Sequence, residues 1–208
     1  MPLQSVIQGQ VGPSTYADGV INDIRLEKTG GLVVQELHGR YYENAYRKNL
    51  FYAYSSLQTL SAVGTAMTGL ILYNGATNVN LVLQKINLQV PVTSASMTGI
   101  ALASGTPGLQ TLVPTTTTAA TKTGNCFLGG PPSQAIAYTI ATTLTTAAFL
   151  SLMHNTAAIN TVGQDYTQID FEGSIIVPPN TVVCLAALGA ASAASAVTSS
   201  IMWEEVPV

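Results

Sequence analysis

Residues 165–177 read DYTQIDFEGSIIV, and this stretch decides the fold class. Its side chains alternate in character with a period of two. Thr167, Ile169, Phe171, Ile175 and Val177 fall on one face, and Gln168, Asp170, Glu172 and Ser174 fall on the other, with Ile176 as the single exception. This alternation is typical of a β-strand that is buried on one side only. The stretch therefore predicts a strand at the edge of a hydrophobic core.

Seven further runs have a similar β-like character, rich in Val, Ile and Thr and poor in sustained helical periodicity. They are residues 67–73, 79–90, 97–103, 135–144, 147–154, 181–188 and 199–206. Together with the first run they make about eight strands, the number found in a jelly roll or a similar double sheet. The sequence thus predicts an all-β fold, a β-sandwich of jelly-roll type.

Turn residues separate several of these runs. Asn74-Gly75 predicts a hairpin between the runs 67–73 and 79–90, with a short loop that extends to Asn78. Pro178-Pro179-Asn180 predicts a strand end and a tight corner, because prolines donate no ladder hydrogen bonds and Asn tolerates a left-handed backbone. The segment 110–134 contains Thr, Gly-Gly and Pro-Pro runs, and it is either an irregular connection or a Thr-rich exposed strand followed by a loop.

The composition indicates an unusually neutral surface. Charged residues make up 8% of the 208 residues, against a globular norm of about 25%, while hydrophobic residues reach 47%. The most apolar stretch, 182–197, is too rich in Ser, Gly and Ala for a membrane span. The first residues, MPLQSVIQGQ, carry no secretory pattern, so we expect a chain that stays in the cytoplasm where it is made. A formal net charge of −3 disfavours a nucleic-acid partner.

The distribution of charge marks a boundary near residue 52. Ten of the seventeen charged residues precede it, five acidic and five basic. The remainder of the chain must present Thr, Ser, Asn and Gln wherever it meets solvent. We therefore expect an extended N-terminal docking segment over 1–52, followed by the β-sandwich domain over 53–208.

No residue pattern nominates a catalyst, a cofactor site or a metal site. Cys126 and Cys184 are far apart in a chain without an export signal, which favours buried free thiols over a disulfide bond. His38 and His154 are isolated from them and from each other, whereas metal ligands come in close pairs. The nucleophile, phosphate-loop and zinc-helix motifs are all missing from the sequence. These patterns indicate a protein that is not an enzyme.

Two groups of carboxylates allow a functional and a structural interpretation. Asp170 and Glu172 share a strand face, as a glycosidase pair would, yet their face is the polar one and a solvated surface explains them better. Asp165 belongs to the same group. Glu204 and Glu205 beside Trp203 could form a sugar platform, although a terminal strand with one buried aromatic explains them equally well.

The richest feature is the stretch HGRYYENAYRKNLFYAY, residues 38–54. With Tyr16 it holds six of the nine tyrosines and two of the three arginines. Tyr and Arg are enriched at interface hot spots, and acidic neighbours argue against a single-stranded nucleic-acid platform. We predict a protein interface made of Arg40, Tyr41, Tyr42, Tyr46, Arg47, Tyr52 and Tyr54. The i, i+4 spacing of Tyr42, Tyr46, Leu50 and Tyr54 also suits a short amphipathic helix.

Four stretches together resemble a known family of proteins. They are GLVVQELHGRYYENAYRKNLFYAY (31–54), TGLILYNGATNVNLVLQKI (68–86), FEGSIIVPPNTVVCLAAL (171–188) and MWEEVPV (202–208). They are similar to virion structural proteins of tailed bacteriophages, of the kind that form trimeric jelly-roll cement or decoration proteins on capsids. The resemblance implies a homotrimer on the capsid surface that binds the major capsid protein, with an extended segment that clamps neighbouring subunits. Asn180 departs from the Gly expected after the paired prolines.

Two other functions are open at this point. The first is a receptor- or glycan-binding jelly-roll module of a phage tail fibre, which would need aromatic and polar groups on one loop cluster. The later loops consist mainly of Thr, Ala and Gly, which favours the cement protein. The second is an RNA-packaging coat protein, which the balanced charge of residues 1–52 disfavours. Membrane, nucleic-acid and small-molecule partners are not expected.

Overall fold

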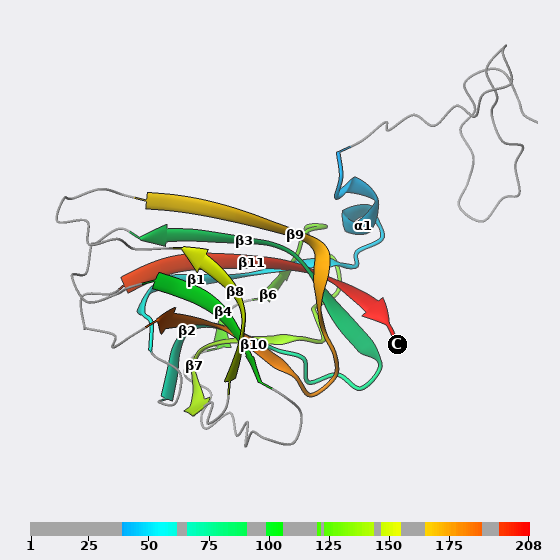
Figure 1. Cartoon of the computed structure of the whole chain (residues 1–208). Helices are drawn as coiled ribbons and strands as arrows, with labels where there is room; N and C mark the ends of the chain where they lie inside the picture. The colour runs from blue at the N-terminus through cyan, green and yellow to red at the C-terminus, as the bar shows by residue number, and fades with distance from the viewer. Residues whose placement is uncertain are drawn as a thin grey trace, which may run out of the picture. The chain divides into compact units, whose positions relative to one another are not determined.

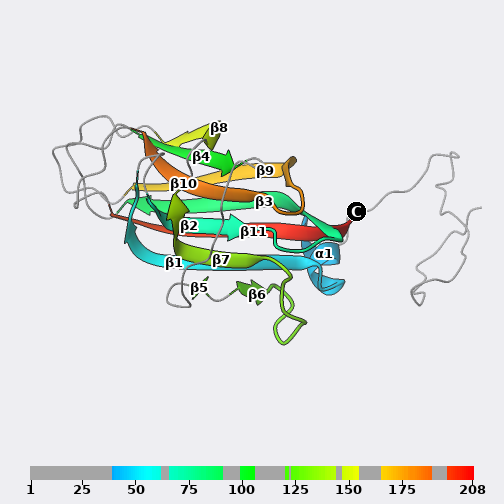
Figure 2. The same cartoon turned by 90° about the horizontal axis from the view of Figure 1, so that it is seen from below.

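The computed structural model describes residues 39–61, 66–90, 99–105, 120–121, 123–143, 147–154, 165–188 and 196–208. Within these ranges the chain forms one short helix and two antiparallel sheets, of five and six strands. The two sheets pack face to face, as Figures 1 and 2 show from two directions. The all-β sandwich predicted from the sequence is therefore confirmed.

The five-stranded sheet has the strand order β6-β1-β11-β3-β9. Its strands are β6 (Thr123–Asn125), β1 (Leu50–Thr59), β11 (Ala196–Pro207), β3 (Val79–Val90) and β9 (Asp165–Val177). The six-stranded sheet has the order β5-β7-β2-β10-β4-β8. Its strands are β5 (Ala120–Thr121), β7 (Ile136–Thr143), β2 (Ala66–Tyr73), β10 (Val182–Leu188), β4 (Gly99–Gly105) and β8 (Ala147–His154). Helix α1 (Tyr42–Tyr46) precedes β1.

The main core lies between the two sheets. Every second residue of the central strands points into it, as the strand period requires. Its largest fully buried side chain is Trp203 of β11, whose ring stacks on Phe51 of β1 with 6.2 Å between centroids. Leu83 and Ile86 of β3 are fully buried beside them. The interpretation of Trp203 as a core residue is confirmed.

All eight predicted strands are present. The bounds of β3, β8 and β9 agree with the sequence prediction, and the others differ by a few residues. Along β9 the side chains of residues 166–177 alternate between more and less exposed positions, and Ile176, the one apolar residue of the polar face, is exposed with it. The prediction misses β1, whose first three residues it places in the arm. The segment 110–134, for which a connection and a strand were both open, contains the short strands β5 and β6.

The hairpin predicted at Asn74-Gly75 is wrong. Strands β2 and β3 belong to different sheets, so residues 74–78 form a corner that crosses the sandwich. Asn74 is fully buried there, and its side-chain amide donates to the carbonyls of Val79 and Val177, both at 2.9 Å. A turn-forming residue thus ties two sheets together instead of closing one ladder.

The second corner, at Pro178-Pro179-Asn180, is confirmed. It carries the chain from β9 in one sheet to β10 in the other. Asn180 adopts a left-handed backbone with φ of 59°, which Asn accommodates better than most residues. Its N–H donates to the carbonyl of Asn74 at 2.7 Å, and the N–H of Asn74 donates to the carbonyl of Thr181 at 3.0 Å. The two corners therefore brace each other.

The structure places the domain boundary earlier than residue 52. Contacts divide the chain into Met1–Arg40 and Tyr41–Val208. Leu50 and Phe51 are buried in the core, because β1 is an internal strand between β6 and β11. The predicted arm over 1–52 thus includes α1 and the start of a core strand, and its residues 1–38 lie outside the described part of the chain.

At its central strand β10, the six-stranded sheet is apolar on both of its faces. In β10, Val183, Leu185 and Ala187 join the main core, while Val182, Cys184 and Ala186 join a second buried cluster on the opposite face. The Cys184 thiol is buried and free, and burial raises its pKa to about 12. Cys126 is partly buried and also free, so the prediction of two unpaired thiols is confirmed.

Candidate functional site

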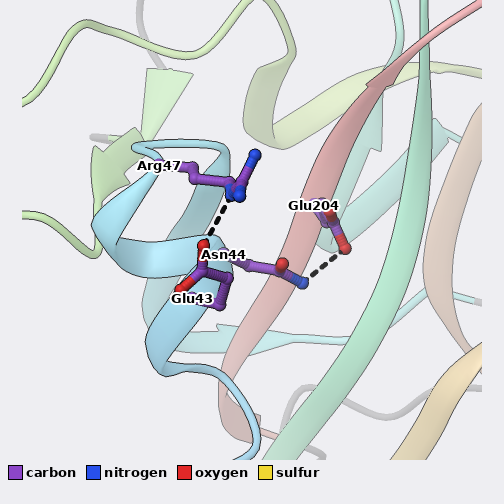
Figure 3. A network of polar contacts seen from close by, with 4 residues as sticks. All are labelled: Glu43, Asn44, Arg47 and Glu204. Atoms are coloured by element: carbon purple, nitrogen blue, oxygen red, sulfur yellow. Dashed lines mark hydrogen bonds and ion pairs between the residues drawn. The ribbon is translucent and has the colours of Figure 1, made fainter. Parts of the chain in front are cut away.

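Helix α1 carries the first part of the predicted interface. Its five residues are tied to the sheet by the side-chain amide of Asn44, which donates to Oε2 of Glu204 on β11 at 2.8 Å (Figure 3). The amide of Gln84 on β3 donates to the same oxygen at 3.4 Å. At the C-terminal end of the helix, Nε of Arg47 donates to Oε1 of Glu43 at 2.7 Å. A helix this short forms only with such tertiary support.

Four of the predicted interface tyrosines present large ring surfaces to solvent. Their exposed fractions are 43% for Tyr42, 62% for Tyr46, 39% for Tyr52 and 54% for Tyr54. The rings of Tyr42 and Tyr46 stack on each other with 5.9 Å between centroids, one helical turn apart. Side chains alternate between the two faces of a strand, and Phe51 and Ala53 of β1 face the core. Tyr52 and Tyr54 therefore point outward.

The remaining predicted residues lie beside the helix. Arg40 is exposed, and Arg47 is exposed with its guanidinium on Glu43. Tyr41 is half-buried, with the ammonium of Lys85 5.7 Å from the centre of its ring. This distance suits a cation–π contact. The seven predicted residues therefore lie on α1, on the residues that flank it and on β1.

Gly124 of β6 explains how the ring of Tyr52 is seated. The two residues are opposite each other in the β1–β6 ladder. A Cβ atom on Gly124 would lie 2.4 Å from the Tyr52 ring, so the ring occupies the space that a side chain would fill. An aromatic ring laid over a cross-strand glycine is a known way to stabilise an edge strand. Tyr52 therefore helps to hold β6 against β1, in addition to any contact that it makes with a partner protein.

The outer face of the five-stranded sheet holds a feature that the sequence analysis missed. Tyr166 of β9 is 61% exposed and faces the same side of the sheet as Tyr54 of β1. Between the two tyrosines lies an open groove of about 200 Å³. We call this the tyrosine groove, and its outward side chains are Tyr54, Asn87, Gln89, Tyr166, Thr198 and Ser200. Sequence patterns gave no signal for it, because its residues come from four strands far apart in the chain.

Hydrogen bonds fix the floor of the tyrosine groove. The Asn87 amide donates to Oγ of Ser200 at 3.2 Å, and its Oδ1 accepts from the hydroxyl of Tyr166 at 3.1 Å. The Tyr166 hydroxyl also lies 3.4 Å from Oε1 of Gln168. Asn87 thus joins three neighbouring strands, β11, β3 and β9, across the outer face.

The carboxylates of β11 serve the fold. Glu205 is buried, and its Oε1 accepts from the hydroxyl of Ser133 and from the N–H of Gln134 at 2.9 Å. It therefore fastens the loop before β7 to the sheet. Glu204 is partly buried under α1, and this burial raises the pKa of its carboxyl. Their contacts support the structural interpretation over the sugar platform beside Trp203.

Asp170 and Glu172 are exposed on the polar face of β9, as the solvated interpretation predicts. The side-chain amide of Gln168 donates to Asp170 at 3.3 Å. His154 ends β8 opposite Ile100, while His38 and the side chain of Asp165 lie outside the described part. Among the residues whose placement is described, His, Cys, Asp and Glu form no cluster of three that could hold a metal ion.

The described helix is too short to cross a membrane, and the described part of the chain contains no other helix that could do so. Comparison of the chain with protein-family models, with curated proteins and with solved structures gives no match. The function must therefore be argued from the fold and from the two surfaces described above.

Proposed function

We propose that this chain is a non-catalytic virion structural protein, a capsid cement or decoration protein that binds the major capsid protein and stabilises its shell. It would act as a homotrimer on the capsid surface after synthesis in the host cytoplasm. The observation that carries the proposal is the set of exposed tyrosines on α1 and the start of β1, namely Tyr42, Tyr46 and Tyr52. We call these three residues the docking patch.

Physical chemistry supports a protein partner for the docking patch. Tyr side chains offer large contact areas at a small cost in conformational entropy, and they are enriched at hot spots. The patch is held by a helix that Asn44 fastens to Glu204. A preorganised patch loses little freedom on binding, which favours affinity. The resemblance of residues 31–54 to phage virion proteins points to the same class of partner.

The order of the strands supports a sandwich of jelly-roll type. Nine of the described strands are longer than three residues, and without β7 at the side of the six-stranded sheet eight remain. Of these eight, β1-β11-β3-β9 stand in one sheet and β2-β10-β4-β8 in the other. Along the chain, each of these eight strands is followed by one in the other sheet, except that β8 follows β4 within the six-stranded sheet. Such wrapping of antiparallel pairs is the principle of the jelly roll, a fold used by viral capsid and lectin domains. Fold alone does not assign function.

Sedimentation with capsid shells tests the proposal. Shells of the major capsid protein assembled without this chain are mixed with the full-length protein and pelleted. We expect the wild type to pellet with the shells, and the double variant Tyr42→Ala/Tyr46→Ala to bind at least tenfold more weakly. The control is Ile176→Ala, which removes an equally exposed large side chain from β9. If the double variant binds shells as tightly as the wild type, the docking patch is not the surface that binds the capsid. If the wild type does not bind shells, the cement function is excluded.

A further inference from the structure

We propose that the tyrosine groove binds a neutral saccharide, such as a segment of an uncharged polysaccharide. This inference goes beyond the capsid function, because it concerns a different ligand and a different part of the chain. It begins from the positions of the two tyrosines. Tyr54 and Tyr166 stand on β1 and β9, with β11 and β3 between them. Neighbouring strands lie about 4.8 Å apart, so the two carrying strands are roughly 14 Å apart.

The ladder registers place the polar groups between these tyrosines. Ser200 lies opposite Tyr54 and also opposite Asn87, and Gln89 lies opposite both Thr198 and Tyr166. The floor of the groove is therefore made of two amides and two hydroxyls, bounded by aromatic rings. Aromatic walls with a few oriented polar groups are typical of small-ligand sites.

The chemistry of this lining matches a sugar. Sugar hydroxyls both donate and accept hydrogen bonds, and so do the amide and hydroxyl side chains of the floor. The C–H groups of a pyranose face carry slight positive charge, which the negative face of a tyrosine ring attracts. Hydrogen bonds to Ser200 and Tyr166 already orient the Asn87 side chain. Asn87 therefore loses little further conformational entropy when a ligand binds.

Two other classes of ligand fit less well. A single-stranded nucleic acid needs a positive groove, and every residue that lines this one is uncharged. An extended peptide usually adds to a free sheet edge. Here β11 and β3, which form the floor, already pair on both sides and offer no unpaired ladder. The side chains alone must recognise the ligand, which favours a saccharide.

Affinity electrophoresis of the full-length chain tests the inference. The gels contain a neutral polysaccharide (a β-glucan, a galactomannan or a mannan), and parallel gels contain anionic alginate. We expect at least one neutral polysaccharide to retard the wild type, and Tyr54→Ala or Tyr166→Ala to weaken this binding at least tenfold. Tyr166→Phe keeps the ring and should stay within about threefold of the wild type.

Two controls make the outcome specific. Ile176→Ala removes an exposed side chain from the outer side of β9 beyond the groove, and it should bind like the wild type. The docking-patch variant Tyr42→Ala/Tyr46→Ala should also bind the polysaccharide normally, which separates this inference from the capsid function. The inference is overturned if no neutral polysaccharide retards the chain or if the Tyr54 and Tyr166 variants bind normally. Tighter binding to alginate, oligothymidine or an extended peptide would overturn it as well.

Discussion

Asn74 shows how one buried amide connects the two sheets. Its Nδ2 donates to the carbonyls of Val79 and Val177, and its Oδ1 accepts from the N–H of Ala76 at 3.2 Å. The side chain is fully buried, so no water replaces these partners if it is removed. A buried polar group that loses its partner costs about 1–3 kcal/mol.

We therefore expect Asn74→Ala to lower the free energy of unfolding by about 2–4 kcal/mol, because two carbonyls and one N–H lose a buried partner. Urea denaturation followed by Trp203 fluorescence measures the change. Asn78→Ala, at an exposed position in the same corner, is the control and should change stability by less than about 0.5 kcal/mol. Equal midpoints for the two variants would contradict the role assigned to Asn74.

Glu204 gives the fold a pH dependence of known sign. Burial raises the pKa of its carboxyl above the ordinary value of 4.5, so the folded state holds this proton more tightly than the unfolded chain. Stability falls with pH wherever the folded state binds more protons. The contribution of Glu204 is thus most favourable below pH 4.5, and it is lost as pH rises through the raised pKa.

The comparison of the wild type with Glu204→Gln isolates this contribution, since the other titrating groups are common to both proteins. We expect the difference in free energy of unfolding, wild type minus variant, to decrease between pH 4 and pH 7. Urea titrations at half-unit pH steps measure it. A difference that is constant or that increases with pH would show that burial does not raise the pKa of Glu204.

At the scale of elements, sequence patterns predicted the strands better than their connections. The alternation in β9 and the Val, Ile and Leu run of β3 define their bounds, because side-chain period is a local property. The corner at Asn74-Gly75 was mistaken for a hairpin, since turn residues do not reveal whether the chain stays in one sheet. β1 was missed because Tyr42, Tyr46, Leu50 and Tyr54 have a helical spacing that covers the helix–strand junction.

The two candidate surfaces also differ in whether local sequence could predict them. The docking patch was predictable because its residues are adjacent in sequence and rich in Tyr and Arg. The tyrosine groove was not, because Tyr54 and Tyr166 meet only through the pairing of β1, β11, β3 and β9. Pairing between distant strands depends on the global arrangement of the core, which no local pattern specifies.

Two truncations test where the folded unit begins. Removal of residues 1–40 should leave the urea midpoint close to that of the full chain, because Tyr41–Val208 is a compact unit by itself. Removal of residues 1–52 deletes Leu50 and Phe51, and the loss of Phe51 alone takes about 3–5 kcal/mol from the core around Trp203. We expect this shorter chain to lose cooperative unfolding. A stable chain 53–208 would restore the boundary at residue 52.

At the scale of the whole molecule, the neutral composition predicts association. Only 8% of the residues are charged, so the surface of a single chain is mostly neutral and contacts between subunits would cover part of it. Light scattering at micromolar concentration should give a mass close to three times the 21.6 kDa of one chain. Dilution should not dissociate a trimer whose subunit contacts are extensive and apolar. A monodisperse monomer at this concentration would contradict the trimer and weaken the capsid proposal.

The most direct test of the central claim is a pair of electron cryo-microscopy maps of the capsid. One map is made from particles with this protein and the other from particles assembled without it. The proposal predicts extra density on the outer surface, with three copies of a two-sheet sandwich at each junction of major capsid subunits and with α1 against the shell. Identical maps, or extra density on the tail alone, would contradict the claim that this chain is a capsid cement protein.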